Sequence, residues 1–106
     1  MTNESSQPVR EARGLPDAPL DAMAQFAGEH VPALRESGGV VLFDHAEHTH
    51  DSWRKAAVEE LAREVAPKRM NAVVGIDEAA IARVLDYLDR APGVTGQVFV
   101  LEQPSR

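Results

Sequence analysis

Three short runs of apolar residues constrain the fold more than any other feature of the sequence. They are VVLF at residues 40–43, RMNAVVG at residues 69–75 and GQVFVLE at residues 96–102. Short apolar runs bounded by glycine, proline or aspartate are typical of strands that are buried on both faces, as in a parallel sheet. The sequence therefore predicts three buried strands.

A helical pattern precedes each of these runs. Residues 20–37 place apolar side chains at helical spacing, with Pro32 expected to kink the helix and two glycines at 38 and 39 expected to end it. Ser52 should cap a second helix over residues 53–66, and Asp77 should cap a third. The order helix-strand-helix-strand-helix-strand predicts an α/β fold: a truncated Rossmann-like, three-layer unit of three parallel strands with helices on both faces.

The first 16 residues differ in composition from the rest of the chain. They are polar, contain proline and glycine, and show no periodicity, so we expect residues 1–16 to form a flexible leader or an arm that orders on a partner. Residues 17–103 then make up the folded domain. A chain of 106 residues is long enough for one domain at most.

Composition excludes several classes of function. A net charge of -6 argues against binding nucleic acid, which needs clustered lysine and arginine. No apolar run is long enough to cross a membrane, so we expect a cytoplasmic protein without a membrane partner. There are no cysteines, which rules out disulfides, thiolate metal sites and thiol catalysis.

Three segments, in the same order, resemble the C-terminal half of a short-chain dehydrogenase/reductase (SDR). KAAVEELAREVAPKRMNAVVG at residues 55–75 is similar to the segment after that family's catalytic tyrosine. AIARVLDYLDRAPGVTGQVFVLE at residues 80–102 is similar to its last helix and strand, and VPALRESGGVVLF at residues 31–43 to its long helix and fifth strand. The resemblance implies a Rossmann-like fold and nicotinamide chemistry in the complete family.

The departures from the family pattern bear on catalysis. Lys55 fits the lysine of the family's Tyr-x-x-x-Lys motif, but Asp51 stands where the tyrosine belongs, and a carboxylate titrates far below a phenol. Asp44 and His45 stand where the family places its serine. The glycine-rich turn that holds the nucleotide is missing too. We therefore expect no cofactor bound by this chain alone, with NAD(P) held by a partner subunit.

The elements that the resemblance retains are those through which the family assembles. We also expect the outer edge of the 40–43 strand to be bare, and such an edge invites association. The leading hypothesis is a non-catalytic subunit that stabilises or activates a full-length SDR dehydrogenase or ketoreductase, or that forms a homodimer. The candidate interface residues are Met23, Phe26, His30, Trp53, Val58, Leu61, Leu85, Tyr87 and Phe99.

A histidine-rich loop supports an alternative hypothesis. The segment DHAEHTHD at residues 44–51 could serve a redox-independent isomerase, cyclase or hydratase, with His48 or His50 as the base and Asp51 paired with Lys55. His45, His48 and His50 are also weak candidates for a metal site, since imidazoles bind zinc. The simpler interpretations are a solvated loop and an ordinary ion pair one helical turn apart.

Overall fold

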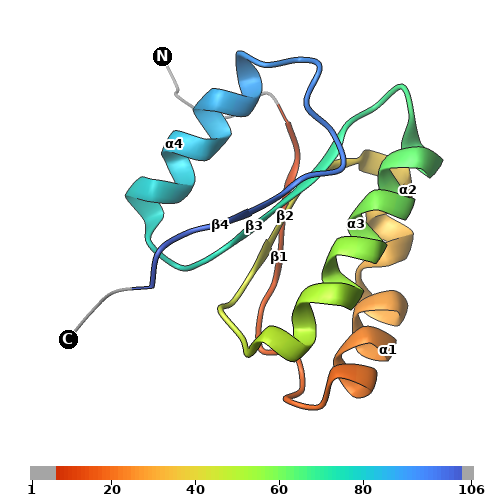
Figure 1. The fold of residues 1–106 in the computed structure, drawn as a ribbon. Helices are drawn as coiled ribbons and strands as arrows, with labels where there is room; N and C mark the ends of the chain where they lie inside the picture. The colour runs from red at the N-terminus through yellow and green to blue at the C-terminus, as the bar shows by residue number, and fades with distance from the viewer. Residues whose placement is uncertain (1–6, 104–106) are drawn as a thin grey trace.

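A computed structural model describes residues 7–103 as one sheet with helices on both faces (Figure 1). The elements, in chain order, are β1 (Val9–Ala12), α1 (Pro19–Glu29), α2 (Val31–Ser37), β2 (Gly39–Phe43), the 3-10 turn η1 (His48–His50), α3 (Asp51–Val65), β3 (Met70–Val74), α4 (Glu78–Asp89) and β4 (Val98–Val100).

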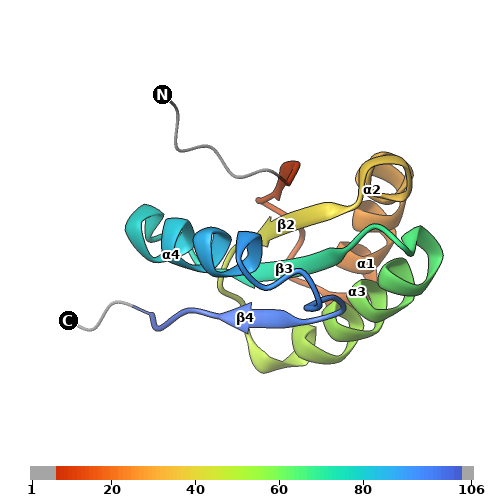
Figure 2. The same ribbon diagram turned by 90° about the horizontal axis from the view of Figure 1, so that it is seen from above.

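The sheet is parallel throughout, and its strands follow one another in sequence order, β1-β2-β3-β4. Helices α1, α2 and α3 cover one face, and α4 covers the other, as the view from above shows (Figure 2). The α/β, three-layer, Rossmann-like prediction is confirmed, with four strands in place of three. Parallel strands need helical crossovers, which is why the two kinds of element alternate along the chain.

The strand that the sequence did not reveal is β1, which lies within the expected leader. It pairs with β2 from Val9 beside Val40 to Ala12 beside Phe43. The expectation of a bare edge on β2 is therefore wrong, and residues 9–12 are part of the sheet and not of a flexible leader. The short VREA segment resembles a polar loop in sequence because β1 lies at the edge, where charged side chains reach solvent or polar partners. Residues 1–6 lie outside the described part of the chain.

Two hydrogen bonds of Arg10 tie β1 to the helical layer. Its Nε donates to Nδ1 of His30 at 2.8 Å, and its Nη2 donates to the carbonyl oxygen of Glu29 at 3.1 Å. Arg10 therefore attaches β1 to the helices through hydrogen bonds. A strand held in this way has no apolar periodicity by which the sequence could indicate it.

Glycine is required where β1 approaches β2. Gly39 has φ +101°, and a Cβ at this position would collide with the carbonyl oxygen of Pro8. The same carbonyl accepts a hydrogen bond from the amide of Val40 at 2.9 Å. The glycine pair at 38 and 39 thus ends α2, as predicted, and also lets β1 lie close beside β2.

The core is divided by the sheet into two clusters. On the side of α1–α3, the rings of Phe26, Phe43 and Trp53 pack with centroids 5.3–5.8 Å apart. On the other side, Ile81 and Leu88 of α4 pack on apolar side chains of β2 and β3. Every residue of β2 and β3 is buried, in agreement with the apolar runs that predicted these strands.

The helix boundaries follow local chemistry. The first predicted helix is divided at His30, because Pro32 cannot continue the hydrogen-bond pattern of α1. Helix α3 begins at Asp51 after η1 and has no side-chain cap, so the predicted capping role of Ser52 is wrong. Asp77 caps α4 as predicted, since its carboxylate accepts hydrogen bonds from the amides of Ala79 and Ala80.

Among residues 7–103, no helix is long and apolar enough to cross a membrane.

Candidate functional site

Two adjoining cavities lie at the carboxyl ends of the strands, where parallel α/β folds place their sites. The first, here called the β1–β2 cavity, has a volume of about 400 Å³ and lies between the loops after β1 and β2. The second, the β4 cavity, has a volume of about 480 Å³ and lies between the start of α3 and the end of β4. Both volumes are in the range of small-molecule sites.

Arg54 lines both cavities and is buried. Only 6% of its surface is exposed. Its Nη1 donates to the carbonyl oxygen of Asp44 at 2.9 Å, and its Cζ lies 4.4 Å from the centre of the Phe43 ring. Burial lowers the pKa of Arg54 below its usual value, while the carboxylates of Asp44 and Asp51 oppose the shift. A guanidinium stacked on an aromatic ring is held in one orientation.

Asp44 joins the first two loops of the site. Its carboxylate accepts hydrogen bonds from Nη1 of Arg13 at 3.0 Å and from the amide of Gly14 at 2.9 Å. Arg13 also donates to the carbonyl oxygen of Gly75, so the loops that follow β1, β2 and β3 are linked. Because the ion pair is partly exposed, we attribute to it loop positioning more than stability.

His50 is a structural residue. It is buried, its Nδ1 accepts a hydrogen bond from the indole N–H of Trp53 at 3.0 Å, and its Nε2 lies 2.9 Å from the carbonyl oxygen of Asp17. An imidazole whose Nδ1 accepts from an indole donates its Nε2 proton to a carbonyl. Both nitrogens of His50 are therefore used, and neither is free to act as a base or to bind a metal.

Several other residues of the histidine loop, together with Lys55 of α3, lie at the β4 cavity. His45, His48, Asp51 and Lys55 all line it. Lys55 lies 4.0 Å from Glu59, one turn further along α3, and the expected pairing with Asp51 is not formed among the described residues. Nor do residues 7–103 contain a group of three histidine, cysteine or acidic side chains arranged to hold a metal ion.

The predicted interface residues fall into two groups. Phe26, Trp53, Val58 and Leu61 belong to the chain's own core and offer no surface to a partner, because the helical stripe that suggested them faces the sheet. His30, with a side chain 12% exposed, is held by Arg10.

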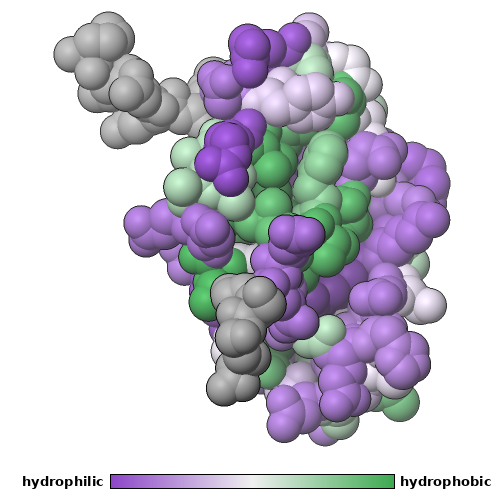
Figure 3. All heavy atoms as spheres, turned by 60° about the vertical axis from the view of Figure 1, so that its left-hand side comes forward, coloured by the Kyte–Doolittle hydropathy of each residue, from purple (hydrophilic) through white to green (hydrophobic). Residues whose placement is uncertain are grey.

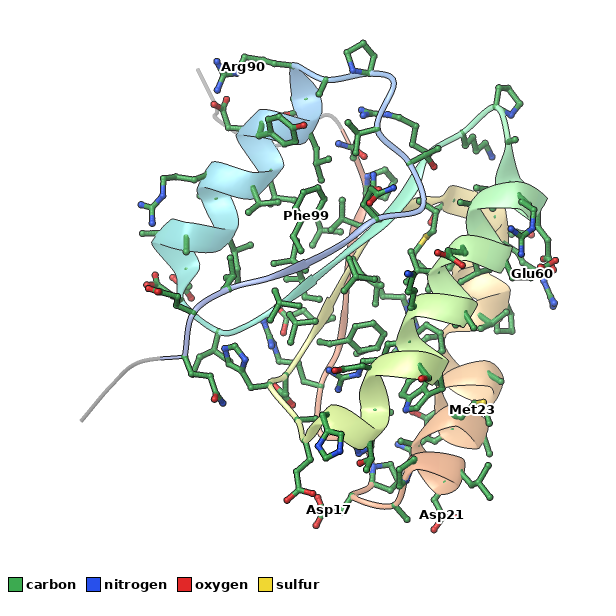
Figure 4. All side chains as sticks on the ribbon, in the orientation of Figure 1. Asp17, Asp21, Met23, Glu60, Arg90 and Phe99 are labelled. Atoms are coloured by element: carbon green, nitrogen blue, oxygen red, sulfur yellow. The ribbon has the colours of Figure 1, made fainter. Side chains whose placement is uncertain are left out.

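The second group remains accessible in whole or in part. Met23 is exposed on α1 and points away from the sheet (Figure 4). Tyr87 of α4 is 47% exposed and contacts the half-buried Phe99 of β4 edge-on, with ring centroids 6.1 Å apart. Leu85 is half-buried at the margin of the α4 cluster.

Sequence reasoning missed Arg54 and the role of Asp44. A signal for Arg54 was present, because positions 54, 58, 61 and 65 share one face of α3 and the last three are apolar. A charged residue within an apolar stripe indicates a buried polar group with a specific environment. The side-chain partner of Asp44, by contrast, is Arg13, which lies directly after β1, the strand that the sequence did not reveal.

The comparisons with known proteins found one relationship. The family model described as short chain dehydrogenase-like protein matches residues 10–101. This range begins within β1 and ends just after β4. No curated protein and no solved structure matches the chain.

Proposed function

The chain belongs to the family of short chain dehydrogenase-like proteins, and from this premise we propose that it is a non-catalytic subunit of that family. In this proposal it assembles with a full-length short-chain dehydrogenase or ketoreductase and stabilises or activates it. A second copy of the chain is the alternative partner.

The observation that carries the proposal is an exposed apolar face formed by α4 and β4, which comprises Leu85, Tyr87, Phe99 and Val100 and is here called the α4–β4 face. Val100 is 69% exposed and Tyr87 is 47% exposed. Figure 3, which brings this side of the molecule forward, shows hydrophobic residues gathered between polar margins. Among the described residues β4 pairs only with β3, so its outer edge is unpaired. An apolar edge without a charge or a proline favours pairing with another sheet.

The chemistry of the family's catalytic motif is altered, which supports a non-catalytic role. Lys55 and Asp51 lie one turn apart at the start of α3, in the positions that the resemblance assigns to lysine and tyrosine. A carboxylate at position 51 cannot replace a phenol as the acid at neutral pH. Tyr87, the one tyrosine in the sequence, lies on α4 at the opposite face of the sheet.

The loop after β1 does not suit a nicotinamide dinucleotide. The amide of Gly14, which could face a phosphate, already donates to the carboxylate of Asp44. Asp17, Asp44 and Glu47 line the β1–β2 cavity, and their negative charge would repel a pyrophosphate. We therefore propose that NAD(P) binds to the partner subunit and not to this chain alone.

Co-expression with a full-length short-chain dehydrogenase encoded nearby tests the proposal. We expect the two proteins to purify together and the partner's activity or yield to rise in the presence of this chain. Tyr87→Glu should abolish co-purification, because it places a charge in the α4–β4 face. Met23→Glu, an equal change at an exposed apolar site on α1, is the matched control and should not. If both variants lost co-purification to the same extent, or if neither lost it, the role of this face would be contradicted.

A second candidate is supported by the β4 cavity. His48, Asp51 and Lys55 line one hollow of suitable size, which is the arrangement that an isomerase, cyclase or hydratase would need. Alanine at His48 separates the two candidates. An enzyme should keep its fold and lose turnover, whereas a partner subunit should still assemble.

A further inference from the structure

Arg54 is a buried cation whose hydrogen-bonding capacity is largely unused. A guanidinium carries five N–H donors. Within residues 7–103, Arg54 forms one hydrogen bond, from Nη1 to the carbonyl oxygen of Asp44. Its Nε is closed off from solvent and has no acceptor among the described residues. Most of the donors of this side chain therefore lack an acceptor in the part of the chain that the structure describes.

Such a group is costly to bury. Charged side chains leave water only when they are paired or well hydrogen-bonded. The Phe43 ring offsets part of the cost by cation–π attraction. The nearby carboxylates of Asp44 and Asp51 contribute at longer range, and Asp44 is already shared with Arg13. An acceptor with a negative charge would complete the environment of Arg54.

The charge of the two cavities decides where an anion would bind. The β1–β2 cavity is lined by three carboxylates, those of Asp17, Asp44 and Glu47, which outnumber its one cation, Arg54, and disfavour an anion. The β4 cavity has one carboxylate, that of Asp51. The same cavity contains two cationic side chains, Arg54 and Lys55. His45 and His48 are further hydrogen-bond donors there. The β4 cavity is therefore the more favourable of the two.

The opposite wall of the β4 cavity is apolar. It is formed by Val74, Val98, Val100 and Leu101. A ligand that fits must therefore have a charged end and a hydrocarbon body. A phosphate ion or acetate would satisfy Arg54 but would leave the apolar wall uncovered, whereas a medium-length carboxylic acid would satisfy both parts.

We propose that the β4 cavity binds a small organic carboxylate, with the carboxylate held by the Nη edge of Arg54 and the hydrocarbon body lying against Val98, Val100 and Leu101. A carboxylate and a guanidinium have matching geometry, which allows two parallel hydrogen bonds. This site shares Val100 with the α4–β4 face, but Tyr87 does not line the cavity, so Tyr87→Glu tests the assembly without removing a proposed ligand contact.

Trp53 provides a direct readout, because its buried ring centre lies 5.8 Å from Cζ of Arg54 and it is the one tryptophan in the chain. Hexanoate should change its fluorescence in a saturable way at low ionic strength and neutral pH. Hexan-1-ol, which has the same chain without the charge, should bind about tenfold more weakly or worse, since hydrogen bonds to charged groups are among the strong ones. Acetate and inorganic phosphate should also bind more weakly than hexanoate.

Arg54→Met tests the arginine itself, because it removes the charge and retains most of the volume. We expect it to weaken hexanoate binding about tenfold or more. Arg63→Met makes the same change on the exposed side of α3 and should leave binding unaffected. Near-UV circular dichroism checks that both variants fold.

The proposal is overturned if hexanoate gives no saturable signal, if hexan-1-ol binds as well as hexanoate, or if a folded Arg54→Met variant binds hexanoate normally. Stronger binding of phosphate or acetate than of hexanoate would also overturn it. If Arg54→Met does not fold, the comparison of these ligands on the native chain decides the question, because it needs no substitution.

Discussion

Replacing Gly39 by alanine should detach β1 from the sheet. Gly39 has φ +101°, in a region that side-chain-bearing residues rarely adopt. A Cβ would also collide with the carbonyl oxygen of Pro8, the residue that leads into β1. The backbone of one strand or the other must then move, and the hydrogen bond from the amide of Val40 to Pro8 is lost.

The expected cost follows from these two effects. A strained backbone conformation costs of order 1–3 kcal/mol, and a lost backbone hydrogen bond costs about 1 kcal/mol. We therefore expect Gly39→Ala to lower the free energy of unfolding by about 2–4 kcal/mol. For a domain of this size, that corresponds to a fall in Tm of about 10 °C or more.

Gly28→Ala is the matched control. Gly28 lies within α1, and a Cβ there would meet no atom within 4 Å. Alanine should stabilise this helix by roughly 0.5–1 kcal/mol. Urea denaturation measures both changes, and hydrogen exchange at the amide of Val40 reports the release of β1 directly. If Gly39→Ala were neutral, or if the two variants behaved alike, the pairing of β1 with β2 would be refuted.

Three further changes test other parts of the structure. Asn71→Ala should lower the free energy of unfolding by about 2–4 kcal/mol, because the buried amide bonds Val94 and the backbone of Gln97; an equally stable variant in urea denaturation would contradict this. Asp77→Ala should lower the free energy of unfolding by about 1 kcal/mol, because α4 loses its N-terminal cap. Urea denaturation measures this change as well, and an unchanged free energy of unfolding would contradict the capping role of Asp77. Burial and the charge of Arg10 lower the pKa of His30, so the native state binds fewer protons than the unfolded chain and stability should fall as the pH drops below about 6.5. Urea midpoints between pH 7.5 and 5.5 should show this fall, and it should be smaller in His30→Gln.

The sequence was sufficient to predict the strands that are buried on both faces. β2 is apolar along its whole length, and β3 is apolar except for the hydrogen-bonded Asn71, because helices cover both of their sides. The cap of α4 was also predictable, because a capping aspartate acts on amides only two and three residues away. These features depend on local sequence or on uniform burial.

The edge strand and the site could not be predicted in the same way. β1 carries Arg10 and Glu11, which an edge strand tolerates, so it has no apolar pattern. The burial of Arg54 is indicated by its place in the apolar stripe of α3, but its stacking on Phe43 joins two separate elements, and no local pattern encodes that contact. The histidine loop shows the converse problem. Three histidines close together suggested a metal site, yet His50 is turned inward to bond with Trp53.

The mass of the assembled protein tests the central claim most directly. Light scattering during size-exclusion chromatography, on this chain alone and with a full-length short-chain dehydrogenase, should show a complex that contains two or more chains, and Tyr87→Glu should dissociate it. Two results would contradict the account. One is a stable monomer of 11.5 kDa that does not bind the dehydrogenase. The other is oxidation of an alcohol by this chain alone with a nicotinamide cofactor.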